Sequence, residues 1–300
     1  MHEREASDLN GRFGIPGELA FRAVNGVVVA DVSHAAATAS IALQGAHLMH
    51  WAPSGMAPVV WLSPQARLAP GTPIRGGVPV CWPWFGPHAG GSSFPSHGFA
   101  RTASWELAQA DPAPQALQLL FRLVPDPAVR PWWPHATALE LRMVIGARLE
   151  MELVTRNQGD GPVAVSQALH TYFGVGDVRR VRIEGLDGCP YIDKVDGGRR
   201  GMQHGALTIR GETDRIYLDA VADCVIDDPV LARRIRVEKR GSRSTVVWNP
   251  WADKAAAMGD LGENGYLHMV CVESGNVADD TVILAPGSAH RLWTGCSVEQ

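Results

Sequence analysis

Short apolar runs recur along almost the whole chain and alternate with turn residues. The runs are rich in Val, Ile, Leu and Thr and are bounded by Gly, Pro, Asn and Asp, a pattern that is typical of β-strands. The segment Leu139–Thr155 is predicted to form two strands joined near Gly146. Further strands are expected at Val27–Val32, Ala39–Trp51, Leu117–Val124, Val163–Phe173, Val181–Glu184, Ala206–Ile209, Arg234–Lys239, Thr245–Trp248, Leu267–Glu273 and Thr281–Leu284.

Helical periodicity is weak by comparison. No long segment carries apolar residues at the spacing of an amphipathic helix, and only short helical turns are expected, near Asp126–Arg130 and Ser63–Leu68. Residues 156–162 (RNQGDGP) give a strong turn signal, and Ala108–Gln115 is predicted to be a hairpin loop. Because neither α/β alternation nor a low-complexity linker is present, the sequence predicts one large, mainly β domain over residues 1–300, built as a sandwich or barrel.

The composition narrows the classes of partner. Hydrophobic residues make up 46% of the chain and charged residues 19%, as in ordinary soluble globular proteins. The net charge of −4 argues against nucleic acid as a partner. No apolar run approaches the roughly 18 residues of a membrane span, and the first residues, MHEREASDLNGRFG, lack the apolar core of a signal peptide. We therefore expect no association with a membrane.

The five cysteines are widely spaced and include no CxxC pair. They stand at positions 81, 189, 224, 271 and 296. This odd, unpaired set predicts neither a disulfide framework nor a zinc site, and reduced thiols in a cytoplasmic protein are the simplest expectation. The oligomeric state is not indicated by the sequence.

Residues 73–101 (PIRGGVPVCWPWFGPHAGGSSFPSHGFAR) concentrate the residues most suited to ligand binding. Gly and Pro make this stretch poor helix material, so it is predicted to form loops that line a cleft. Arg75 and Arg101 offer planar donors for an anion, Trp82 and Trp84 offer apolar faces for a sugar ring, and His97 titrates near neutrality. Taken singly, each is more often a surface or core residue. Together in one stretch they favour a small anionic, partly apolar ligand, such as a phosphorylated sugar.

Three further residues could contribute to chemistry. His170 ends the apolar strand 163–169, Glu273 follows the apolar run 268–272, and Asp214 lies in GETDRIYLD beside Arg215. A carboxylate delivered by a strand can have a raised pKa and act as a base. The alternatives are a histidine that supports its aromatic neighbours, an exposed glutamate at a strand end and an aspartate paired to the next residue.

Several common motifs are absent. There is no GxGxxG after a strand, no GxxxxGK[ST] and no GxSxG. The segment Ala285–His290 (APGSAH) resembles part of a metal-binding β-helix motif, but the partner HxH element is missing. We therefore expect no nucleotide cofactor and no resident metal.

The motifs resemble, in their order, those of the D-hexose-6-phosphate mutarotases, the glucose-6-phosphate 1-epimerases of the aldose 1-epimerase superfamily. The resemblance covers roughly residues 20–295 and is most specific in the first two blocks. The matching segments are PIRGGVPVCWPWFGP (73–87), SHGFAR (96–101), ALHTYFGVGD (168–177), TDRIYLD (213–219), VVWNPW (246–251) and MVCVESGNV (269–277).

The resemblance implies a fold and a set of roles. The fold is a large single-domain antiparallel β-sandwich of the galactose mutarotase type, with the site in a cleft on one face. His170 and Glu273 match the catalytic acid and base. The matching substrate-binding residues are Arg75, Arg101, Asp214 and His97, to which the cleft candidates Ser96 and Trp84 are added. Ser96 stands where some members have Gln, and the shorter side chain is expected to reach the ligand only through water.

The implied reaction interconverts the α and β anomers of a hexose 6-phosphate, expected to be glucose 6-phosphate. A base removes the proton of the anomeric hydroxyl while an acid protonates the ring oxygen, so the ring opens and recloses on the other face of the aldehyde. This chemistry needs no cofactor. Two alternatives remain open: a non-catalytic carbohydrate-binding sandwich, and a metal-dependent enzyme with His170, His97 and Glu273 as ligands.

Overall fold

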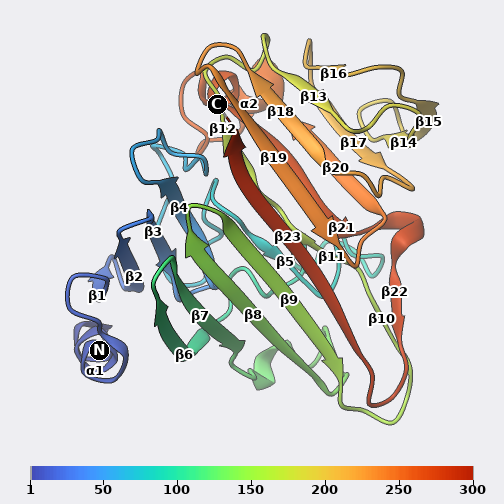
Figure 1. Ribbon diagram of the computed structural model, residues 1–300. Helices are drawn as coiled ribbons and strands as arrows, with labels where there is room; N and C mark the ends of the chain where they lie inside the picture. Colours follow the sequence, from blue (N-terminus) through green and yellow to red (C-terminus); the bar gives the residue numbers. More distant parts are fainter. Residues whose placement is uncertain (1, 300) are drawn as a thin grey trace.

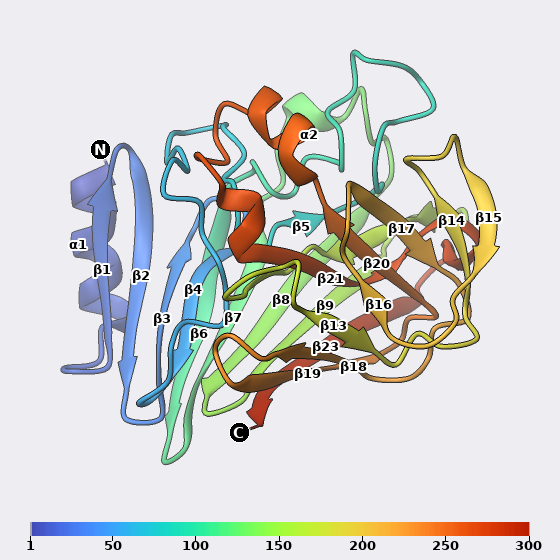
Figure 2. The same ribbon diagram turned by 90° about the horizontal axis from the view of Figure 1, so that it is seen from above.

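Two large antiparallel sheets lie face to face in the computed structural model, which describes residues 2–299 (Figures 1 and 2). The nine-stranded sheet has the order β16 (Leu207–Thr208), β13 (Arg182–Glu184), β18 (Cys224–Asp228), β19 (Arg233–Arg240), β23 (Ala289–Glu299), β9 (Leu149–Asn157), β8 (Thr137–Gly146), β7 (Ala116–Leu123) and β6 (Trp105–Ala113). The eight-stranded sheet has the order β15 (Arg199–Met202), β14 (Pro190–Asp193), β17 (Thr213–Tyr217), β20 (Ser244–Asn249), β21 (Met269–Asn276), β11 (Gln167–Leu169) and β5 (Val80–Cys81), with β12 (Tyr172–Gly174) also paired to β21. The predicted antiparallel β-sandwich is confirmed.

Smaller elements surround the two sheets. A four-stranded sheet extends the structure on the N-terminal side, and a two-stranded sheet closes the opposite side (Figure 1). The strands are β1 (Leu19–Val24), β2 (Val27–His34), β3 (Ala37–Ala42) and β4 (His47–Pro53), and the pair β10 (Val163–Val165) and β22 (Val282–Leu284). The helices are α1 (His2–Phe13) and α2 (Trp251–Ala257), with 3₁₀ turns η1 (Pro127–Val129), η2 (Gly265–His268) and η3 (Ala278–Asp280).

The core fills the space between the sheets. Strand β7 alternates buried and half-buried residues, and its inward side chains Leu117, Leu119 and Phe121 are almost fully buried. This period-2 burial is what a strand with one face on a core requires. Buried hydrogen bonds also cross between the sheets: the Trp82 indole N–H donates to the Thr155 hydroxyl at 3.1 Å, and that hydroxyl donates to Gln167 Oε1 at 3.0 Å.

Most predicted strands are present, with differences at their ends. The expected pair within Leu139–Thr155 is observed as β8 and β9, which turn just after Gly146. The single strand expected at Ala39–Trp51 is two strands, because a turn separates β3 from β4, and Val163–Phe173 contains three short strands. The predicted hairpin loop at Ala108–Gln115 is wrong for most of its length, since β6 continues to Ala113.

Helix α1 was not predicted. Only Ala6 and Leu9 of its twelve residues are buried, so its apolar face is too narrow to be recognised in the sequence. A side chain fixes it to the sheet instead: the Asn10 amide donates to Phe21 O at 2.7 Å, and Phe21 N–H donates to Asn10 Oδ1 at 2.8 Å. The turn expected near Asp126–Arg130 is η1, whereas Ser63–Leu68 forms a turn without helix.

Gly98 is the tightest backbone contact in the loop that follows β5, and its replacement tests how that loop is held. Its φ is +71°, and an added Cβ would lie 1.9 Å from the carbonyl oxygen of Trp82. We expect Gly98→Ala to lower the free energy of unfolding by about 3–5 kcal/mol. Gly86→Ala is the matched control: its φ is +75° but no atom lies within 4 Å, so only the left-handed strain of about 1–2 kcal/mol applies. Equal losses in denaturant unfolding of the two variants would contradict this account.

Candidate active site

His170 and Glu273 are brought together by strand register. Leu169 at the end of β11 faces Ser274 on β21, and Tyr172 at the start of β12 faces Cys271. The register is therefore unchanged across the gap between β11 and β12, and position 170 falls opposite position 273. In an antiparallel pair, opposite residues project from the same face. The gap arises because the chain bonds elsewhere: the His170 N–H donates to Pro79 O at 3.0 Å.

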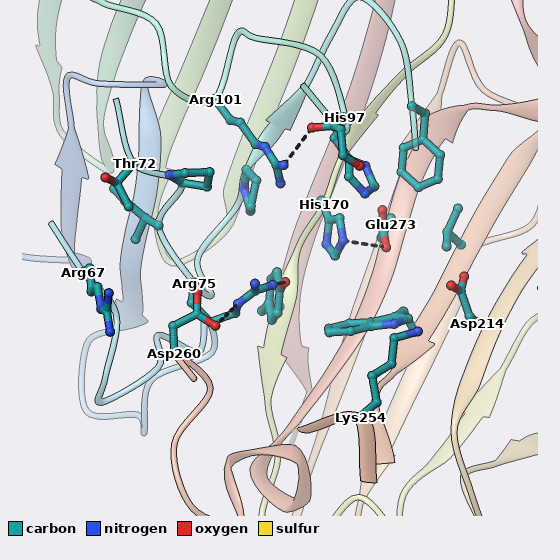
Figure 3. A pocket seen from close by; sticks show the side chains of 18 of the residues that line it. Arg67, Thr72, Arg75, His97, Arg101, His170, Asp214, Lys254, Asp260 and Glu273 are labelled. Carbon is teal, nitrogen blue, oxygen red and sulfur yellow. Dashed lines mark hydrogen bonds and ion pairs between the residues drawn. The ribbon is translucent and has the colours of Figure 1, made fainter. Parts of the chain in front are cut away.

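The two side chains meet where both are buried. His170 Nε2 lies 3.3 Å from Glu273 Oε1, at the distance of an ion pair but without hydrogen-bond geometry (Figure 3). Glu273 is 1% exposed, and neither of its oxygens has a hydrogen-bond partner among residues 2–299. The His170 ring stacks on Tyr172 at 4.9 Å between centroids. A buried carboxylate that lacks partners is costly, so it indicates a group kept for function.

Burial shifts the pKa of both groups in opposite directions. It raises the pKa of Glu273 well above its usual range, and the nearby negative charge of Asp214 adds to this effect while Lys194 opposes it. It lowers the pKa of His170 well below its usual range, and His97 and Arg101 lower it further. A carboxylate made more basic in this way is suited to general-base chemistry.

The pair lies in a cavity of about 610 Å³. Its walls are formed by loops on both sides of β5, by the region of α2 and by the face of the eight-stranded sheet that points away from the nine-stranded sheet (Figure 3). The lining residues are Arg67, Thr72, Pro73, Ile74, Arg75, Pro79, Phe85, Ser96, His97, Arg101, His170, Tyr172, Lys194, Asp214, Val246, Trp248, Lys254, Gly259, Asp260 and Glu273. It therefore gathers the predicted His170, Glu273, Arg75, Ser96, His97, Arg101 and Asp214.

The two predicted arginines differ in how they are held. Arg75 Nε donates to Asp260 Oδ1 at 3.0 Å and its Nη1 donates to the Tyr172 hydroxyl at 3.2 Å. Arg101 Nη2 donates to the backbone oxygen of Ser96 at 2.7 Å, and Arg101 forms no ion pair within residues 2–299. The charge of Arg101 is therefore available to an anionic ligand, while that of Arg75 is partly neutralised.

His97 and Asp214 are further residues of the wall. His97 has a φ of +64°, and its Nδ1 accepts the N–H of Gly86 at 3.3 Å. Burial lowers the pKa of His97 to about 3, so the ring is neutral. The Asp214 carboxylate lies on β17 and pairs with Lys194 Nζ at 3.2 Å.

The prediction that Trp84 faces the ligand is wrong, and so is the same expectation for Trp82. Trp84 is 8% exposed and does not line the cavity. Its indole N–H donates to Pro95 O at 2.8 Å, and its ring packs edge-on against Phe94 and Phe99. Trp82 is almost fully buried in the core between the sheets. The tryptophan that does line the cavity is Trp248, which lies edge-on to His170.

Sequence reasoning did not identify several charged residues of the wall. Two of them, Lys194 and Asp260, lie in loops, and Lys254 lies in a short helix. No local sequence pattern distinguishes these three residues. Tyr172 could have been found, because it directly follows the His170 segment on a strand that pairs with β21.

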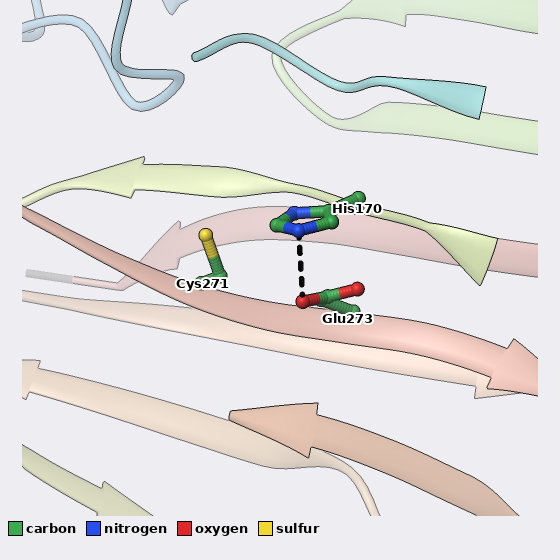
Figure 4. Close-up of side chains that lie close together, drawn as sticks. All are labelled: His170, Cys271 and Glu273. Carbon is green, nitrogen blue, oxygen red and sulfur yellow. Dashed lines mark ion pairs between the residues drawn. The ribbon is translucent and has the colours of Figure 1, made fainter. Parts of the chain in front are cut away.

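Three potential metal donors lie close together, but they differ from the set considered above. The described residues contain one group of three donors within metal-binding reach, formed by His170, Cys271 and Glu273 (Figure 4). His97 is not part of it.

His47 supports the segment that carries Arg75, and it makes a testable contribution to pH stability. Its Nε2 lies 2.9 Å from Gly76 O, and burial lowers its pKa to about 4. The unfolded imidazole, with a pKa of about 6.5, takes up a proton that the folded one refuses, so stability is lost as pH falls from about 6.5 towards 4.

Lowering the pH from 7 to 5 is expected to reduce the free energy of unfolding by about 2 kcal/mol through the titration of His47. In urea unfolding at the two pH values, His47→Gln should show a pH dependence smaller than that of the wild type by this amount. An unchanged pH dependence would show that His47 titrates equally in both states.

Comparison with known proteins identifies the family of this chain. The family model described as aldose 1-epimerase matches residues 29–297. This chain belongs to the aldose 1-epimerase family. It is thus an isomerase, and the resemblance drawn from the sequence motifs is confirmed.

Relatives in the aldose 1-epimerase family align with most of the length of this chain. It is 42% identical over 244 residues, 81% of either chain, to a Salmonella typhimurium protein named "Putative glucose-6-phosphate 1-epimerase". An Escherichia coli protein of the same name is 38% identical over 260 residues, 86% of either chain. The crystal structure of "a putative mutarotase (YeaD)" from Salmonella typhimurium superposes with a TM-score of 0.90 at 38% identity, covering 95% of both chains.

A galactose 1-epimerase structure from Lactobacillus acidophilus has a TM-score of 0.68 at 14% identity, a likeness of fold alone. The predicted galactose mutarotase type of sandwich is therefore confirmed. Within the described residues, no helix has the length and apolar character that a membrane crossing requires.

Proposed function

We propose that this aldose 1-epimerase family member interconverts the α and β anomers of a hexose 6-phosphate, with glucose 6-phosphate as the expected substrate. The observation that carries the proposal is the His170–Glu273 pair, 3.3 Å apart on the floor of a cavity whose wall also presents Arg75 and Arg101. The names of the relatives support the phosphorylated substrate.

Glu273 is the base and His170 the acid. The opposite pKa shifts favour protonated Glu273 with neutral His170, and moving that one proton gives ionised Glu273 with protonated His170, the form that reacts. In the ionised form, Glu273 takes the proton of the anomeric hydroxyl and His170 gives its proton to the ring oxygen. The C1–ring oxygen bond breaks, the aldehyde rotates, and the reverse transfers close the ring on the other face. Each group contributes on the order of 10²–10⁴-fold to the rate.

The remaining wall residues orient the sugar. Arg101 and Arg75 bind the phosphate, which fixes the distant end of the substrate and so positions the anomeric carbon. Asp214 and neutral His97 accept or donate hydrogen bonds to sugar hydroxyls, and Ser96 reaches the ligand through water. Trp248 provides the apolar face that Trp84 was expected to offer.

Exchange NMR between the two anomers of glucose 6-phosphate tests the proposal. The protein is expected to accelerate exchange of glucose 6-phosphate and to act much more weakly on glucose, which lacks the anionic group. Binding of glucose 6-phosphate without faster exchange would instead favour the non-catalytic carbohydrate-binding alternative.

A further inference from the structure

A nitrogen, a sulfur and an oxygen donor converge beside the cavity. His170, Cys271 and Glu273 each offer one donor atom, and these atoms all lie within 4.8 Å of one another. Cys271 and Glu273 are two residues apart on β21, so their side chains leave the same face of the strand. Figure 4 shows the thiol and the carboxylate on the side of the strand where the imidazole lies.

One of the three donor groups lacks a competing partner, and a second is shielded from water. Both oxygens of Glu273 are buried without a hydrogen bond among residues 2–299, and Cys271 is fully buried. A buried carboxylate without a partner is stabilised by any cation that can reach it. A mixed imidazole, thiolate and carboxylate set is typical of zinc and of the neighbouring divalent transition metals rather than of magnesium or calcium.

We propose that His170, Cys271 and Glu273 form a binding site for a zinc-like divalent cation, and that such a cation inhibits the enzyme. Metal binding stands on the three side chains alone, whereas inhibition rests on the proposed function. A bound cation occupies the imidazole lone pair and the carboxylate that the proton transfers use, so substrate and metal exclude each other. The fourth coordination position faces the cavity and is open to water.

The observed distances require little movement. Nitrogen and oxygen ligands of a tetrahedral zinc ion lie about 3.4 Å apart, given metal–ligand bonds of about 2.0–2.1 Å, and His170 Nε2 and Glu273 Oε1 already lie 3.3 Å apart. The sulfur has to approach to about 3.6 Å from a present separation of no more than 4.8 Å. A cation reaches the set from the cavity at His170 and Glu273, which line it, while Cys271 lies behind them, packed with Tyr172 and Trp248.

The test uses Co²⁺ as a spectroscopic probe of the metal-free protein. We expect one bound Co²⁺ per chain with a thiolate-to-cobalt charge-transfer band in the near ultraviolet, and displacement of that ion by Zn²⁺. Cys271→Ala should lose the band, whereas Cys296→Ala, which removes an equally buried thiol from the nine-stranded sheet, should keep it. Thermal unfolding of each variant checks that the fold is retained.

Inhibition is measured in the anomer-exchange assay. Zn²⁺ should slow the wild type, a chelator should restore it, and Cys271→Ala should need about tenfold more Zn²⁺ or more for the same effect, since even supporting residues of metal sites contribute 10–100-fold to affinity. Failure of Co²⁺ to bind the wild type, binding without the charge-transfer band, or equal Zn²⁺ sensitivity of Cys271→Ala and wild type would overturn the proposal. Metal binding to a protein that exchanges no anomers would leave the site intact and refute the proposed function.

Discussion

Replacing Glu273 by Gln is expected to reduce kcat for anomer exchange by about 10²–10⁴-fold. The amide keeps the size of the side chain but cannot accept the proton of the anomeric hydroxyl. Glu273 is buried without hydrogen bonds among residues 2–299, so the neutral amide should not lower the thermal midpoint of unfolding. Loss of activity with retained stability would therefore distinguish a catalytic base from a structural residue.

Glu184→Gln is the matched control for this experiment. Glu184 lies on β13 and pairs with Arg234 at 2.8 Å, outside the cavity. It should leave kcat unchanged and alter stability by less than about 1 kcal/mol, as expected for an exposed ion pair. A Glu273→Gln variant that retains wild-type exchange rates would contradict the assignment of the base.

Replacing Arg101 by Ala is expected to raise KM for glucose 6-phosphate much more than KM for glucose. Arg101 forms no ion pair within residues 2–299, so its guanidinium is free to bind the phosphate. A hydrogen bond to a charged group contributes about 1.5–3 kcal/mol, which corresponds to roughly a 10- to 150-fold rise in KM. Because glucose has no phosphate, its kcat/KM should change by only about a few fold.

The control for Arg101 is Arg122→Ala, which removes an arginine paired with Glu140 at 2.9 Å outside the cavity. It should affect neither substrate. Equal losses on glucose and glucose 6-phosphate in Arg101→Ala would show that Arg101 positions the sugar or the loop rather than the phosphate.

The sequence predicted the sandwich more securely than its details. Short apolar runs bounded by turn residues located β7, β8 and β9, because one face of each strand packs on the core. Strand interruptions were not visible: Val163–Phe173 looks like one apolar strand, but the chain leaves β21 between β11 and β12 to bond with the segment before β5. That interruption depends on a segment far away in the sequence, which no local pattern encodes.

The candidate site, like the fold, could be predicted from the sequence only in part. The residue types made His170 and Glu273 candidates, and the family resemblance implied their roles as acid and base. Their approach depends on the register of β11 and β12 against β21, which only the folded sheet defines. Trp84 was misassigned because a tryptophan in a loop can face either the ligand or the core, and the bond from its indole to Pro95 O holds it in the core. Lys194 and Lys254 line the cavity from positions outside the matching motifs.

The acid–base pair is anchored in the sheet, whereas Arg67, Arg75 and Arg101 stand on the loops on either side of β5. Loops tolerate insertion and exchange far better than paired strands do. If the proposed roles hold, the loops can change the substrate preference without altering the acid–base pair. Transplanting residues 67–101 from a relative with a different sugar preference should transfer that preference, while the acid–base pair remains that of the recipient. By this route one scaffold can acquire new substrates through sequence changes in its loops.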